Sequence, residues 1–157
     1  MKVNLSDKID FDRYAAICRD RRSTMWMEAR FLPPDTPELL RRHYETNPND
    51  IGYGIYADDQ FVGVIRLQGI DRHHERADKH TFIDPEWWGR GIGTKATMLL
   101  IEAHRHEFRL ITVSCYENNV GVIKMNQRAG FVIVCGLPRF YVFDGVEIAK
   151  VFMAWYR

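Results

Sequence analysis

The sequence predicts a mixed α/β fold built around one central sheet. Two observations support this prediction. The apolar pattern changes along the chain between the two-residue period of strands and the 3.6-residue period of helices. A glycine-rich segment also joins a strand-like run to a helical run just past the middle of the chain. The length of 157 residues suits a single domain, residues 1–157, with a core of its own.

Composition narrows the functional classes. The chain is 46% hydrophobic and 27% charged, which is typical of a globular protein, and its net charge of +1 disfavours nucleic-acid binding by bulk charge. The sequence contains no signal peptide and no apolar run of about 18 residues, so we expect a cytoplasmic protein without a membrane partner. Three cysteines cannot all pair, which suits a reducing compartment. Cys115 and Cys135 lie in apolar runs and are expected to be buried.

The first third of the chain predicts a strand or arm followed by two helices. Asp10 is a plausible N-cap for the first helix. Thr36 has the same role for the second helix, and Pro37 suits its first position. The expected elements are a strand or arm over residues 1–9 and helices over 11–22 and 37–45.

The remainder predicts strands interrupted by two helices. Two β-rich runs, 51–57 and 61–70, are separated by a short polar turn and indicate an antiparallel hairpin. Gly130 directly after a helical run is a typical helix-terminating signal. The further elements are strands over 77–84, 110–116 and 131–137, a helix over 119–129, and a closing hairpin over 140–143 and 147–156.

The stretch from Ile83 to Thr94 indicates an anion site. A strand-like run ends there, glycines follow at alternate positions, and the pattern then becomes helical with Ala96, Leu99, Leu100 and Ala103 on one face. Glycines allow close backbone approach to a phosphate, and the free N–H groups at a helix N-terminus favour negative charge. We interpret this stretch as the seat of a pyrophosphate.

Three other interpretations of the glycines at 89–93 were compared with this one. Residues 91–96 satisfy the G-x-G-x-x-A form of the dinucleotide fingerprint, but about six residues separate the strand from the glycines, where that fingerprint has none. A Walker loop is excluded because no Gly-Lys-Ser/Thr is present. A tight turn with helix-capping glycines is the simplest structural alternative.

Two wider motifs resemble a known family. The segment Asp-Pro-Glu-Trp-Trp-Gly-Arg-Gly-Ile-Gly at 84–93 is similar to the acetyl-CoA pyrophosphate loop of the GNAT N-acetyltransferase superfamily. The segment 119–131 resembles that family's Asn-x-x-Ser-x-x-x-x-(Glu/Lys)-(Lys/Arg)-x-Gly-Phe helix. Trp88 departs at the usual Arg/Gln position, in the manner of the ribosomal-protein, spermidine and sugar acetyltransferase branch. Val122 replaces the common Ser, and Asn126 stands where many members carry Tyr.

The resemblance implies a mostly antiparallel central sheet with one splayed parallel strand pair and helices on both faces. The pantetheine arm of acetyl-CoA, the implied co-substrate, would enter the split, and no metal is expected. The implied cofactor-binding residues are Phe82, Ile83, Trp88, Gly89, Arg90, Gly91, Ile92, Gly93, Thr94, Asn119 and Asn126.

The candidate catalytic residues are Asp78 and His80. Both share one face of the expected strand by period-2 alternation. Asp78 aligns with a Glu that several members use as base, whereas His80 has an intrinsic pKa closer to neutral pH. A solvated strand face is the alternative for both. Trp26 and Glu28 are the candidate substrate contacts, although a core stripe also explains the apolar residues around them.

The resemblance implies transfer of an acetyl group from acetyl-CoA to a primary amine by direct attack in a ternary complex. We expect the acceptor to be a small metabolite such as an amino sugar, polyamine, amino acid or antibiotic. A protein N-terminus, a non-catalytic acyl-CoA-binding module and a nucleotide-cofactor oxidoreductase stay open as alternatives, as does a homodimer. The sequence does not identify the acceptor, and it leaves open whether a general acid exists.

Overall fold

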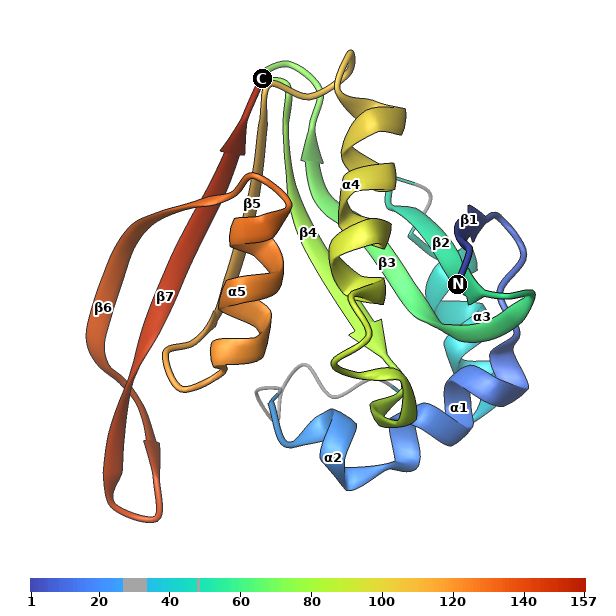
Figure 1. The fold of residues 1–157 in the computed structure, drawn as a ribbon, viewed down its shortest axis with the longest axis horizontal. Coiled ribbons are helices and arrows are strands. Elements are labelled where there is room, and N and C mark those ends of the chain that lie inside the picture. Colours follow the sequence, from blue (N-terminus) through green and yellow to red (C-terminus); the bar gives the residue numbers. More distant parts are fainter. Residues whose placement is uncertain (27–33, 48) are drawn as a thin grey trace.

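One mixed sheet organises the molecule (Figure 1). The computed structural model describes residues 1–26, 34–47 and 49–157, and in these ranges seven strands align in the order β1-β2-β3-β4-β5-β7-β6. Every neighbouring pair is antiparallel except β4 with β5, as predicted. The strands are β1 (Val3–Ser6), β2 (Ile51–Ala57), β3 (Gln60–Asp71), β4 (Arg76–Ile83), β5 (Leu110–Tyr116), β6 (Val132–Phe143) and β7 (Val146–Tyr156).

Helices cover both faces of the sheet, which confirms the expected layering. The helices α4 and α5 pack against each other on one face, and α1 to α3 lie on the other (Figure 1). Their bounds are α1 (Phe11–Arg19), α2 (Arg21–Thr24), α3 (Pro37–Glu45), α4 (Ile92–His104) and α5 (Val120–Arg128). None of the described helices is long and apolar enough to cross a membrane.

The predicted first helix is broken into two. Its N-cap is as expected, because Asp10 accepts a hydrogen bond from the Arg13 N–H at 2.9 Å. Asp20, however, ends α1 with an N–H bond to Ile17 and caps α2 by accepting from the Arg22 N–H at 2.9 Å. An Asp with a good capping position inside a helical pattern therefore redirects the chain.

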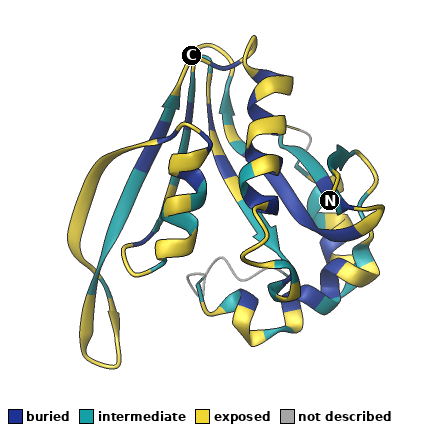
Figure 2. Ribbon diagram, viewed as in Figure 1, coloured by how far each residue is buried: buried dark blue, intermediate teal, exposed yellow. Residues whose placement is uncertain are grey.

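The C-terminal hairpin differs from the sequence prediction. The runs 131–137 and 140–143 form one long strand, β6, whose pairing with β7 shifts register twice. Arg139, near the second shift, has a φ of 57°. Most of β6 is exposed (Figure 2), so the expectation of a buried Cys135 is wrong.

The main core lies between α4 and the central strands, where most of the dark blue ribbon of Figure 2 is found. A second cluster joins α1 and α3 to the opposite face of β3 and β4. These two clusters pack against β4 from both sides, and β4 is the strand that forms one wall of the candidate site.

Candidate active site

The parallel pair β4 and β5 splays apart. The two strands pair only over residues 76–78 of β4 and 110–112 of β5, although both continue for several residues. Beyond this point β5 stays bound to β7, and β4 stays bound to β3. The rest of β4 therefore presents an unpaired edge to the split, as the family resemblance implied.

The register of β4 determines which backbone groups face the split. The Asp84 N–H donates to the Val62 carbonyl of β3 at 2.9 Å. Because backbone direction alternates along a strand, Phe82 also directs its N–H and C=O to β3. Ile83, Thr81 and Lys79 direct theirs to the split. Of the two residues expected to pair with pantetheine, Ile83 is thus better placed than Phe82.

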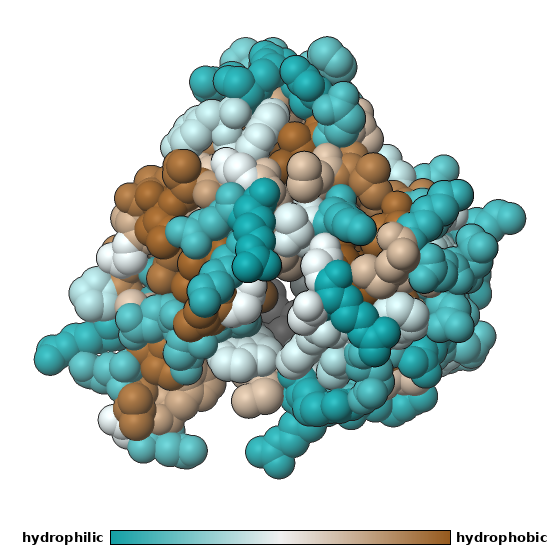
Figure 3. All heavy atoms as spheres, in the orientation of Figure 1, coloured by the Kyte–Doolittle hydropathy of each residue, from teal (hydrophilic) through white to brown (hydrophobic). Residues whose placement is uncertain are grey.

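A cavity of about 1050 Å³ occupies the split and continues to both faces of the sheet. The surface is hollowed near the centre of Figure 3, between the lower parts of α4 and α5. Arg90 and Asn126 are not among the lining residues. The predicted cofactor residues that do line it are Phe82, Ile83, Trp88, Gly89, Gly91, Ile92, Gly93, Thr94 and Asn119.

The N-terminus of α4 opens into this cavity. Gly91 is its N-cap, has a left-handed φ of 75° and supplies no side-chain cap, so the first N–H groups of the helix are left for a ligand. Gly93 allows α5 to approach, since a Cβ there would lie 2.3 Å from the Met125 sulfur. The loop thus has the open amides and the helix dipole of a phosphate site.

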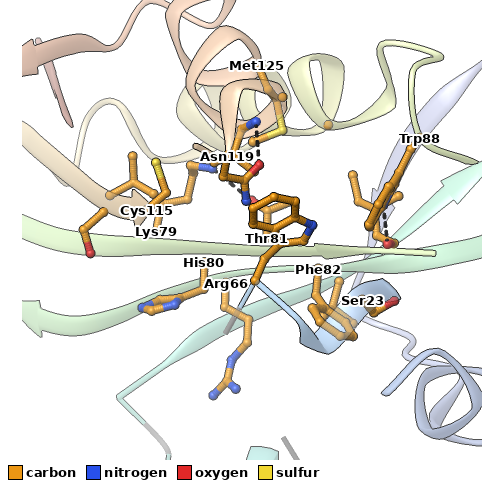
Figure 4. A pocket seen from close by; sticks show the side chains of 18 of the residues that line it. Ser23, Arg66, Lys79, His80, Thr81, Phe82, Trp88, Cys115, Asn119 and Met125 are labelled. Atoms are coloured by element: carbon orange, nitrogen blue, oxygen red, sulfur yellow. Dashed lines mark hydrogen bonds between the residues drawn. The ribbon is translucent and has the colours of Figure 1, made fainter. Parts of the chain in front are cut away.

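Two side chains fix the loop to the end of β4. Asp84 is buried, accepts from the Arg13 guanidinium at 2.5 Å and accepts from the Glu86 N–H at 3.0 Å. The Trp88 indole N–H donates to the Ile83 carbonyl at 2.8 Å (Figure 4). The loop is therefore held in shape by the protein itself, as preorganised anion binding requires.

The structure adds two cations that the sequence reading missed. Lys124 and Arg128 line the cavity from α5. Their i, i+4 spacing places them on one helix face and was the signal available in the sequence. They provide positive charge for an anionic ligand in addition to the loop amides.

Asp78 and His80 line the cavity together on the face covered by α1 to α3. The Thr112 hydroxyl, on β5, donates to the Asp78 carboxylate across the last paired position of the split. Desolvation and the neighbouring Lys79 charge lower the pKa of His80 below 6.5, so His80 is neutral at pH 7. The neutral imidazole of His80 can therefore accept a proton at neutral pH.

Of the two candidate substrate contacts, the structure describes only Trp26. Trp26 lines the cavity on the α1 to α3 face, with Tyr14 and Phe82 beside that part of the lining. Glu28 lies outside the described residues.

Lys79 is a further lining residue that the sequence analysis did not single out. Lys79 of β4 is only 1% exposed and is the largest of the fully buried side chains. Its Nζ lies 2.9 Å from the Thr81 hydroxyl (Figure 4). It also lies 3.5 Å from the Thr97 hydroxyl of α4. Burial lowers the pKa of this amine from 10.5 to about 7.

Comparison with known proteins agrees with this geometry. The family model described as "Acetyltransferase (GNAT) domain" matches residues 3–132. The spermine/spermidine N(1)-acetyltransferase of Bacillus subtilis (strain 168) is 30% identical over 87 residues, which are 50% of this chain and 57% of that protein. The chain thus matches little more than half the length of this curated relative.

Solved structures with the same fold cover nearly the whole chain. The microcin C7 self-immunity acetyltransferase MccE, in complex with acetyl-CoA and AMP, has a TM-score of 0.81 at 16% identity, covering 99% of this chain and 93% of its own. The spermidine N-acetyltransferase of Vibrio cholerae, in complex with CoA and spermine, has a TM-score of 0.81 at 15% identity, covering 99% and 94%. With a splayed strand pair, a glycine loop at a helix N-terminus and a family match over most of its length, the chain belongs to the GNAT acetyltransferase domain family.

Proposed function

We propose that the protein transfers an acetyl group from acetyl-CoA to a primary amine. The observation that supports this best is the position of the α4 N-terminus at the mouth of the β4–β5 split. A pyrophosphate at Gly89–Thr94 would direct a pantetheine arm along the open edge of β4. The relatives named above that contain CoA or acetyl-CoA support the same choice of co-substrate.

The open strand edge suits both the arm and the reaction. An extended amide chain can pair with a strand edge as a peptide does. The backbone N–H groups of Thr81 and Lys79 face the split, and one of them can stabilise the oxyanion that forms on the thioester carbonyl. In this proposal the loop binds the pyrophosphate and the open edge of β4 orients the pantetheine arm. A backbone N–H of the same strand stabilises the negative charge that develops on the thioester oxygen.

The face covered by α1 to α3 suits the acceptor. The acceptor ammonium must lose a proton before its nitrogen can attack. Asp78 is accessible in the cavity, oriented by Thr112, and close to the end of the split, so we assign it as the base. His80, on the same strand face, is the alternative base.

We propose a small metabolite as acceptor, because the cavity extends to the face of the sheet on which α1 to α3 lie. A polyamine is one candidate, since the curated relative acts on spermine and spermidine. A protein N-terminus is the second candidate, supported by the fold match to the ribosomal-protein N-acetyltransferase RimL, with a TM-score of 0.81. A homodimer, a cytoplasmic location and independence from metal remain predictions.

Acetyl-CoA should raise the melting temperature of the protein by several degrees at millimolar concentration. A ligand that binds only the folded state stabilises that state, and at about 100 times its Kd the gain is roughly 2.7 kcal/mol. NAD and NADP at equal concentration should produce no shift in differential scanning fluorimetry. An increase in melting temperature with NAD but not with acetyl-CoA would contradict the proposed acetyltransferase function.

Replacing Asp78 with Asn should reduce turnover at neutral pH on the order of 10²-fold, the low end for loss of a proton-transfer group. The rate should recover partly at high pH, where the acceptor amine is already free. Asp59→Asn in the exposed β2–β3 turn is the matched control and should keep the wild-type rate. His80→Gln should cost less than Asp78→Asn. If both strand variants stay near wild type, neither residue is the base.

A further inference from the structure

A departing CoA thiolate takes up a proton, and the helix position at which many family members carry a Tyr hydroxyl offers none in this chain. Asn126 stands where the motif commonly has Tyr. Its side-chain amide donates to the Val122 carbonyl within α5 at 3.0 Å, and the residue is fully buried. A carboxamide gives up no proton at accessible pH. The sulfur of a departing CoA would therefore have to find its proton elsewhere.

Lys79 is placed to meet that sulfur. It follows Asp78, the last residue of β4 that pairs with β5, so it stands where the split begins. Its side chain lines the cavity on the α4–α5 face, opposite to Asp78 and His80. In Figure 4 it lies near Cys115 of the diverging strand β5, in the space below Asn119 and Met125.

The groups around the Lys79 amine hold it in place without a carboxylate that would keep its proton. The Thr81 and Thr97 hydroxyls fix Nζ, and the Phe131 ring centroid lies 5.7 Å from it. Among the described residues no carboxylate lies within ion-pair distance. The titratable side chains that act on it are His80, its neighbour on β4, and Cys115 on β5, whose own pKa burial raises to about 11. The other contacts, from α4 and from Phe131, are an uncharged hydroxyl and an aromatic ring.

A buried lysine without a carboxylate partner is costly and needs a reason. Because it is desolvated, its ammonium releases a proton readily, and near neutral pH a large fraction is still protonated. Such an ammonium can donate to a thiolate, which is the more basic of the two groups. Structural packing alone would be served better by an apolar residue of the same size.

We infer that Lys79 is the general acid of the reaction and protonates the CoA sulfur. This inference rests on the proposed function. The acceptor nitrogen forms a bond to the acetyl carbon, and the C–S bond breaks with its electron pair left on sulfur. A proton moves from Nζ to that sulfur, giving the free thiol and a neutral lysine. The protons lost from the acceptor leave through the base to solvent, and Lys79 is reprotonated from solvent before the next turnover.

The kinetic test compares Lys79→Met with wild type using acetyl-CoA and its selenoester analogue. With acetyl-CoA the variant should lose on the order of 10² in kcat at neutral pH. The wild-type profile of kcat should fall at high pH, and that falling limb should be absent in the variant. With the selenoester, whose leaving group is more acidic, the loss in kcat should shrink to less than about tenfold.

Tyr116→Phe and Tyr141→Phe, which also change cavity-lining residues, are the controls, and their kcat should stay within about tenfold of wild type. A loss of equal size for both esters, or a falling limb that vanishes in a tyrosine variant instead, would overturn the assignment.

A binding test uses the wild-type protein and needs no turnover. The Lys79 side-chain carbon resonance is titrated with pH in the presence of CoA or of desulfo-CoA, which lacks the thiol. CoA should raise the pKa of Lys79 by about one unit or more, because thiolate and ammonium stabilise each other. Desulfo-CoA should not. Equal titrations with both ligands would place the amine away from the sulfur and refute the inference. A protein that gives the expected shift but acetylates no amine would instead refute the proposed function.

Discussion

Replacing Gly91 with Asp should weaken acetyl-CoA binding on the order of 10³-fold. The new Cβ meets no atom within 4 Å, and Asp tolerates the left-handed φ of 75° better than most residues do. The protein should therefore fold. The carboxylate would stand at the helix N-terminus where the pyrophosphate is proposed to bind, and like charges placed together there cost several kcal/mol. Isothermal titration calorimetry with acetyl-CoA measures the loss.

Gly91→Asn is the matched variant, since it has the same shape without the charge. Its affinity for acetyl-CoA should fall about tenfold or less. The difference in affinity between the two variants therefore measures the electrostatic contribution to the loss. Raising the salt concentration should narrow that difference, because exposed charges are screened. Equal affinity for all three proteins would show that the anion binds elsewhere.

Replacing Lys79 with Met should raise the free energy of unfolding at pH 7 by roughly 4 kcal/mol. The pKa of Lys79 falls from 10.5 to about 7 on burial. Each unit of that difference corresponds to about 1.4 kcal/mol by which the folded state disfavours the charged amine. Methionine fills a similar volume and carries no charge. Urea denaturation of the two proteins measures the difference.

The gain in the free energy of unfolding from Lys79→Met should depend on pH. Between pH 7 and 10.5 the unfolded chain binds a proton at Lys79 that the folded protein does not, so this residue makes stability rise with pH. The advantage of the variant should therefore shrink to about 2 kcal/mol at pH 9. Lys95→Met, on the exposed side of α4, is the control and should change stability by less than about 0.5 kcal/mol at either pH. A constant gain across this range would mean that Lys79 is charged in the folded protein.

The glycine loop and the helices around it were predictable because each has a local cause. Asp10 and Thr36 cap helices where the sequence indicated, with the expected side-chain hydrogen bonds. The helix after Gly91 forms where its pattern predicted, but its buried side differs in part from the predicted face. Leu99 and Ala103 are exposed, whereas Thr97, Ile101 and His104 are buried with Ala96 and Leu100. Local signals therefore predict where the helix lies, and packing against the sheet decides which side of it is buried.

The two faces of β4 were harder to predict. Arg76 to Thr81 carries a polar side chain at every position except Ala77, so no alternation identifies the buried face. The burial of Lys79 therefore comes from tertiary packing by α4 and Phe131. The direction of the Phe82 backbone is likewise a matter of pairing register with β3, which single-strand patterns do not determine. Asn126 was assigned by motif position, and its short side chain is engaged inside its own helix.

The most direct test of the proposed function is the release of CoA thiol from acetyl-CoA in the presence of a panel of primary amines. The panel should contain spermine, an amino sugar, an amino acid and a peptide with a free N-terminus, with mass spectrometry of each product. We expect wild-type protein to form one acetamide for each thiol released with at least one small amine, and Gly91→Asp to do so only at far higher acetyl-CoA concentration. Tight binding of acetyl-CoA with no acetylated product from any amine would contradict the account and leave a non-catalytic acyl-CoA-binding module.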